Sequence, residues 1–231
     1  MMFAMTTRTD GTAAASSVTG PISTPAEAWS ALRDGNQRFV RDEMAHPSQG
    51  AGRRQELAVA QNPFAVIFGC SDSRVAAEII FDQGLGDTFV VRTAGHVLDT
   101  TVIGSIEYGI GVLDARLVVV LAHDSCGAVA AAAHTLATGE QATGFVRAVV
   151  DRVIPSIVNV TSRGDDVRDE NMLRREHVRH TVDQLYGYSA AIRAAVDEGH
   201  VAIVGVEYTL ADGRATLLEV KGDVGEAPVS A

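Results

Sequence analysis

Cysteine is scarce in this chain, which has two in 231 residues, Cys70 and Cys126. Residues 1–23 are rich in Thr, Ser, Ala and Gly and lack a sustained apolar segment. We therefore expect a disordered tail there, no secretory signal, and a cytoplasmic protein whose thiols stay reduced. Two reduced cysteines leave two interpretations open: inert buried side chains, or members of a metal or catalytic site.

Positive charge is also scarce. Lys and Arg number 19 against 29 Asp and Glu, which gives a formal net charge of −10. This balance argues against nucleic acid as a partner, because phosphate binding needs clustered basic side chains. No apolar run approaches the roughly 18 residues of a membrane span. We expect a single domain over residues 24–231, long enough to bury a substantial core, with neither a nucleic-acid nor a membrane partner.

A helix signal opens this domain. Thr24 and Glu27 have the spacing of a capping box, with proline between them at the first helical position, which predicts a helix to about residue 41. Trp29 lies on its apolar face, so this N-terminal helical arm needs a surface to cover, in its own subunit or in a partner. A second helix is predicted over about residues 53–61.

An α/β pattern follows the two helices. Four short apolar runs predict buried strands, over residues 64–68, 89–91, 117–121 and 201–206. Four helical patterns accompany them, over about 76–82, 100–113, 126–137 and 166–198. The alternation predicts an α/β fold with a mostly parallel β-sheet flanked by helices. Asp212-Gly213 is a hairpin signal, so the last strand should be an antiparallel edge strand.

Chemically active residues follow two of the predicted strands. Cys70, Asp72 and Arg74 come directly after the first, and His123 and Cys126 after the third. If those strands are neighbours, both motifs meet at the carboxyl edge of the sheet, where open α/β folds form their sites. Two thiolates and one imidazole suit zinc, and three protein ligands leave one position open, as catalysis requires. The charged pair favours this interpretation over inert cysteines, since charges beside a buried strand are costly unless paired or functional.

The order C-x-D-x-R then H-x-x-C-G, in this α/β setting, resembles the β class of carbonic anhydrases from about Ala28 to Glu219. The resemblance implies zinc-dependent, reversible hydration of carbon dioxide to bicarbonate and a proton. It implies that Cys70, His123 and Cys126 bind Zn²⁺. Asp72 and Arg74 would form a pair that gates the fourth zinc position, with Asp72 as fourth ligand in a closed state.

The resemblance also implies a homodimer, and allows a homotetramer, in which the N-terminal helices wrap around the partner. The substrate cleft would lie at the subunit interface, lined by Gln61, Phe89, Ala94, Tyr108 and Gly127. His96 is the nearest candidate in sequence for a proton shuttle. Some bacterial relatives carry a second, inhibitory bicarbonate pocket that needs a Trp where this chain has Ile67. We therefore expect no such regulation here, although Arg92 matches another element of that pocket.

Three other interpretations stay open. An enzyme on the same scaffold would hydrolyse carbonyl sulfide or carbon disulfide with identical zinc ligands. A zinc-stabilised binding module would keep Asp72 as a permanent fourth ligand, but would have no use for Arg74 as a competing partner. A thiol redox protein would form a reversible disulfide between Cys70 and Cys126 without a metal.

Overall fold

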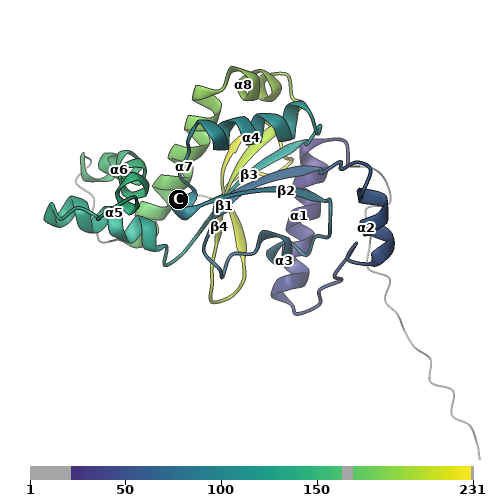
Figure 1. Ribbon diagram of the computed structural model, residues 1–231, viewed down its shortest axis with the longest axis horizontal. Helices are drawn as coiled ribbons and strands as arrows, with labels where there is room; N and C mark the ends of the chain where they lie inside the picture. The colour runs from purple at the N-terminus through teal and green to yellow at the C-terminus, as the bar shows by residue number, and fades with distance from the viewer. Residues whose placement is uncertain (1–21, 163–168, 230–231) are drawn as a thin grey trace, which may run out of the picture.

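The computed structural model describes residues 22–162 and 169–229, and its centre is a five-stranded sheet (Figure 1). The strand order is β2-β1-β3-β4-β5. The first four strands are parallel and β5 pairs antiparallel with β4. The strands are β1 Ala65–Cys70, β2 Thr88–Thr93, β3 Leu117–His123, β4 Ala202–Tyr208 and β5 Ala215–Lys221. The predicted fold class and antiparallel edge strand are confirmed. The tail expected over residues 1–23 lies almost wholly outside the described residues.

Helices cover both faces of the sheet, as the buried strands require. On one face, α1 (Pro25–Val40) and α3 (Ala77–Ile80) pack on Ile67 and its neighbours. On the other, α4 (Thr100–Gly111), α7 (Glu170–Tyr188) and α8 (Ala190–Asp197) cover Val66 and Phe68 (Figure 1). The short helix α2 (Ala51–Leu57) buries none of its residues.

A third apolar cluster lies beside the sheet. It joins α5 (Gly127–Thr138), α6 (Val146–Ser162) and α7, and it includes both cysteines. The sequence prediction missed α6, whose β-branched residues and internal Pro155 lower its intrinsic helix preference. Packing against α5 and α7 offsets that preference. The long helix predicted over 166–198 is two helices, because Ser189 ends α7 and its hydroxyl caps the first turn of α8.

The N-terminal helix finds its surface within its own chain. The capping box at Thr24 and Glu27 is present, and α1 begins at the predicted proline. Trp29 is 2% exposed and packs in the same cluster as Tyr208 and Leu217. Of the two surfaces that the sequence left open, its own subunit or a partner, it is its own subunit that covers Trp29.

Within the two described ranges, the helices include none that is both long enough and apolar enough to cross a membrane.

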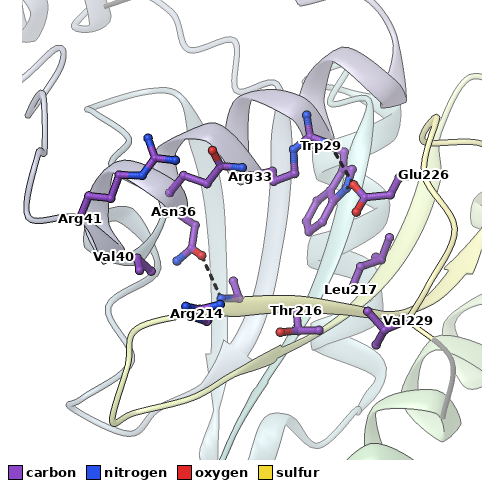
Figure 2. A pocket seen from close by; sticks show the side chains of 12 residues that line it. Trp29, Arg33, Asn36, Val40, Arg41, Arg214, Thr216, Leu217, Glu226 and Val229 are labelled. Atoms are coloured by element: carbon purple, nitrogen blue, oxygen red, sulfur yellow. Dashed lines mark hydrogen bonds and ion pairs between the residues drawn. The ribbon is translucent and has the colours of Figure 1, made fainter.

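Between α1 and β5 lies a hollow of about 370 Å³, with Trp29, Arg33 and Glu226 on its wall (Figure 2). Glu226 accepts hydrogen bonds from the indole Nε1 of Trp29 at 2.9 Å and from Arg33 at 3.1 Å. The segment after β5 is thereby tied back onto α1. The ring of Trp29, the only Trp in the sequence, is therefore buried while its N–H keeps a hydrogen-bond acceptor.

Asn36 links α1 to two other segments. Its buried side-chain amide donates to the carbonyl oxygens of Ile80 at 3.1 Å and Gly213 at 2.8 Å. Its Oδ1 accepts the backbone N–H of Ala215 at 2.9 Å. One side chain therefore satisfies three backbone groups around the helix, the α3 turn and the β4–β5 hairpin.

We predict that Asn36→Ala lowers the free energy of unfolding by about 3 kcal/mol, because it leaves buried backbone groups without partners. Urea unfolding measures the change. The neighbouring exposed Gln37→Ala is the control and should shift stability by less than about 0.5 kcal/mol. Equal stability of Asn36→Ala and the control would contradict this role of Asn36.

Candidate metal centre

Parallel pairing brings the two motifs together at one edge of the sheet. β1 and β3 are neighbours, with Gly69 opposite Leu121, so Cys70 and His123 leave the sheet side by side. Cys126 follows on the turn that leads into α5. The ligand atoms of these three residues all lie within 4.8 Å of one another, and all three side chains are buried. This convergence is the one that the sequence predicted.

The imidazole of His123 is oriented by its own turn. Its Nδ1 lies 2.7 Å from the carbonyl oxygen of Asp124, which can only accept, so Nδ1 carries the proton. Nε2 then carries a lone pair and no proton. It is buried without a hydrogen-bond partner among the described residues. An orphaned buried acceptor is costly, whereas a metal-binding His uses this tautomer with its other nitrogen tied to a carbonyl. The donor set fits zinc.

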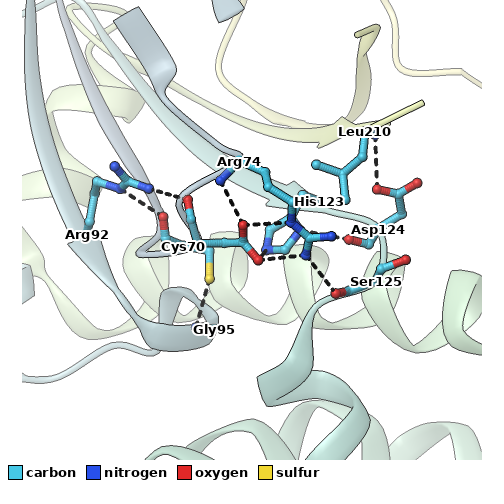
Figure 3. Close-up of polar contacts among 9 residues, drawn as sticks. Cys70, Arg74, Arg92, Gly95, His123, Asp124, Ser125 and Leu210 are labelled. Atoms are coloured by element: carbon cyan, nitrogen blue, oxygen red, sulfur yellow. Dashed lines mark hydrogen bonds and ion pairs between the residues drawn. The ribbon is translucent and has the colours of Figure 1, made fainter. Parts of the chain in front are cut away.

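The two thiols influence each other. A hydrogen bond from Cys126 is the largest influence on Cys70 and lowers the pKa of its thiol. The hydrogen bond to Cys70, together with burial, raises the pKa of Cys126. Cys70 also accepts the backbone N–H of Gly95 at 3.2 Å (Figure 3). The two sulfurs thus face one buried position, which suits a divalent cation because one ion can satisfy both.

Asp72 is held at the border of this cluster. Arg74 donates from Nε to Oδ1 at 2.9 Å and from Nη2 to Oδ2 at 2.7 Å, and its backbone N–H also reaches Oδ1 (Figure 3). These hydrogen bonds from Arg74 hold the pKa of the Asp72 carboxyl well below its usual range. Oδ2 also lies 3.9 Å from Nε2 of His123. The carboxylate therefore stands beside the candidate ligands while paired with a guanidinium.

Comparisons with known proteins agree with this geometry. A family model for carbonic anhydrase matches residues 65–215. The carbonic anhydrase of Mycolicibacterium smegmatis is 56% identical over 206 residues, which cover 89% of this chain and 99% of that relative. Carbonic anhydrase 2 of Mycobacterium tuberculosis is 53% identical over the same coverage. A tetrameric β-carbonic anhydrase of Sordaria macrospora superposes with a TM-score of 0.64 at 23% identity, over 71% of this chain and 85% of that one.

The chain belongs to the β-class carbonic anhydrases. The match of the family model covers more than half of the chain and includes both motifs of the cluster. The resemblance recognised from C-x-D-x-R and H-x-x-C-G is confirmed, and so is the identification of this protein as a carbonic anhydrase.

Arg92 has a structural task in this carbonic anhydrase. It donates from Nε to the carbonyl oxygen of Cys70 at 2.8 Å and from Nη2 to that of Asp72 at 2.7 Å. The guanidinium thus fixes the backbone of the segment that carries the first cysteine and the carboxylate (Figure 3). Ile67, the residue that replaces the Trp of the inhibitory pocket in some relatives, is fully buried in the core.

The second motif is anchored to β4. The backbone N–H of Asp124 donates to the carbonyl oxygen of Tyr208, and its Oδ1 accepts the N–H of Leu210 at 3.0 Å (Figure 3). Ser125 adopts φ 52°, the left-handed conformation that lets the turn bring His123 and Cys126 to one point. The H-x-x-C turn is therefore held by the strand beside it.

The predicted cleft residues divide into two groups. Ala94 precedes Gly95, whose N–H reaches Cys70, and Gly127 follows Cys126, so both lie next to the cluster. The three others lie toward the amino ends of the strands. Gln61 precedes β1, and Phe89 pairs with Val66 near the start of β2. The ring of Tyr108 lies beside that of Phe89, with centroids 6.1 Å apart. Along β2, Phe89 is about 13 Å from the carboxyl end at about 3.3 Å per residue. One chain alone does not bring these three to the cluster.

Two histidines differ from the sequence interpretation. His96, the candidate shuttle, is 1% exposed, and burial lowers its pKa well below the usual value, so the protonated form that a shuttle needs is disfavoured. The charged residues around His177 predict a solvated helix face, but its side chain is 2% exposed. Its contacts come from two other segments, α6 and the Gly95–His96 turn, so no local pattern in the sequence marks it. Its ring nitrogens contact Ser156 and Gly95.

Proposed function

We propose that this β-class enzyme catalyses the zinc-dependent, reversible hydration of carbon dioxide to bicarbonate and a proton. Cys70, His123 and Cys126 would hold the metal. The observation that carries the proposal is the buried meeting of two thiols with an imidazole nitrogen that has no other hydrogen-bond partner within residues 22–162 and 169–229. When bound, zinc acts as a Lewis acid and activates water as a nucleophile at neutral pH.

The protein's own contribution begins with the ligands. The carbonyl of Asp124 fixes the tautomer and ring plane of His123, so Nε2 faces the sulfurs without reorganisation. Gly95 donates to the Cys70 sulfur, and Arg92 fixes the backbone on either side of Ser71. These contacts are made by rigid strand ends and tight turns, which favours a preorganised site.

Asp72 and Arg74 would control access to the fourth position. The bidentate pair supports this role, because Arg74 competes for the carboxylate that would otherwise fill the ligand set. Paired with Arg74, Asp72 stays ionised and its Oδ2 remains close to the cluster. It can there accept a hydrogen bond from the reacting water and orient it. Arg74 also contacts the carbonyl oxygen of Ser125 at 3.3 Å, which ties the pair to the second motif.

A homodimer would complete the substrate cleft. β2 is an edge strand, and two copies joined antiparallel along it would place the amino end of one β2 beside the carboxyl end of the other. The partner subunit's Phe89 and Tyr108 would then approach Cys70. Tyr108 is 46% exposed in the single chain, and Gln61 borders an exposed hollow with Leu57 and Leu85. The Sordaria macrospora relatives are tetrameric, which is compatible with two such dimers.

The proposal predicts that the protein purified under reducing conditions contains one zinc ion per chain and hydrates carbon dioxide. Cys126→Ser should lose both, because a hydroxyl is a poor replacement for a thiolate ligand. Metal analysis and stopped-flow hydration measure the two properties, with the exposed Ser71→Ala as the control. Carbonyl sulfide and carbon disulfide are assayed on the same preparation. A folded wild-type protein without zinc would contradict the proposed function. Faster turnover of carbonyl sulfide or carbon disulfide than of carbon dioxide would assign that hydrolysis as the function instead.

Asp72→Asn should retain zinc and lower carbon dioxide turnover at least about tenfold, because an amide cannot accept on both sides as the carboxylate does. Zinc content and the stopped-flow rate are measured together, with the exposed Ser73→Ala as a control on the same loop. Wild-type turnover in zinc-loaded Asp72→Asn would remove Asp72 from the mechanism.

The shared cleft predicts complementation between two defective chains. Cys126→Ser lacks a metal ligand, and the double variant Gln61→Ala/Tyr108→Ala lacks the cleft side chains. Co-expression should restore activity, since each heterodimer contains one site with an intact ligand set and an intact partner cleft. Activity is compared with a mixture of the separately purified proteins. No gain on co-expression would show that both sets of residues act within one chain, or that the cleft residues do not matter.

A further inference from the structure

The donor to the Cys70 sulfur lies in a strained turn. Gly95 has φ 65° and His96 φ 41°, so two successive residues adopt the left-handed conformation. A Cβ at position 95 would lie 2.6 Å from the Cβ of Ala128, so only glycine fits there. A turn of this kind persists only where the surrounding structure fixes it.

His177 fixes this turn from α7. Its Nε2 lies 2.8 Å from the carbonyl oxygen of Gly95, the same residue whose N–H reaches Cys70. A carbonyl can only accept, so Nε2 carries a proton and donates. The Nδ1 atom of His177 lies 2.8 Å from the hydroxyl of Ser156, which is fully buried on α6.

The protonation of His177 follows from its surroundings. Burial lowers the pKa of His177 to about 4, so the ring is neutral at neutral pH and Nδ1 is an acceptor. The Ser156 hydroxyl lies between the carbonyl oxygen of Val153 at 2.6 Å and Nδ1 at 2.8 Å, and its single proton serves these two acceptors. Nε2 of His177 donates to Gly95.

The ring of His177 also packs the turn against β1. Its centroid lies 4.2 Å from that of His96, and His96 meets Phe68 edge-on at 6.3 Å. Phe68 is two residues before Cys70 on the same strand. The two imidazoles, tilted by 37° to each other, therefore connect α7 to the strand that carries Cys70.

We propose that His177 is a positioning residue for the metal centre: it holds Gly95 so that the backbone N–H points at the Cys70 thiolate, and this contact sets how tightly the cluster binds its metal. The inference rests on the proposed zinc site. His177 touches neither metal nor substrate in this scheme, so its effect is expected mainly in metal affinity.

The test compares two replacements of nearly equal length. His177→Gln keeps an N–H near the position of Nε2, whereas His177→Met has no donor. Zinc affinity is measured by competition with a chelator, and the thiolate-to-metal charge-transfer band is recorded after substitution with cobalt(II). We expect His177→Met to weaken zinc binding about 10–100-fold and to shift the band, as loss of an outer contact does in other metal sites. His177→Gln should stay close to wild type in both.

Leu185→Ala is the control, since it removes a fully buried side chain from the same helix but from an apolar cluster other than the one that contains the cysteines. It should lower the melting temperature and leave zinc affinity unchanged. Wild-type affinity and an unshifted band in His177→Met would overturn the proposal, as would equal losses in His177→Met and His177→Gln.

If His177→Met does not fold, His177→Asn replaces it, because its amide is too short to occupy the position of Nε2. Weaker zinc binding than in His177→Gln supports the role, and equal binding overturns it. Absence of zinc from the wild type itself would refute the proposed function instead, so the two failures are distinguishable.

Discussion

The parallel pairing of β1 with β3 is the constraint on which the candidate metal centre depends. Cys70 and His123 are 53 positions apart, and they meet because their strands end at the same edge of the sheet. Both strands are buried over their whole length, so a register shift would displace apolar side chains from two cores at once. The geometry of the ligands is therefore as firmly fixed as the core itself.

The site creates a local electrostatic environment that differs from the rest of the chain. The formal charge of the protein is −10, yet two arginines bind the Cys70–Arg74 segment, one within it and one from β2. Arg74 binds the carboxylate of Asp72, and Arg92 binds two backbone carbonyls. Backbone groups complete the arrangement, through the Gly95 N–H and the Asp124 carbonyl. A site that handles carbon dioxide and bicarbonate benefits from donors that need no rearrangement.

Support for the cluster extends beyond the sheet. α7 contacts the sheet on one side and α6 on the other, and it carries His177 to the turn beside Cys70. α6 supplies Ser156 to the same histidine. The apolar cluster of α5, α6 and α7, which contains both cysteines, thus packs directly around the candidate metal centre.

Local chemistry in the sequence determined much of this protein. Buried apolar runs predicted the parallel strands, the capping box predicted where α1 begins, and Cys70, His123 and Cys126 were recognisable because their side chains suit one metal. Tertiary structure alone decided that α6 is a helix despite Pro155, that Trp29 is covered by its own chain, and that His96 and His177 are buried against each other. Ligand identity is a property of single side chains, and strand and cap patterns are local. Burial of a histidine, or the partner of Gly95, depends on segments that meet only when the whole chain has folded.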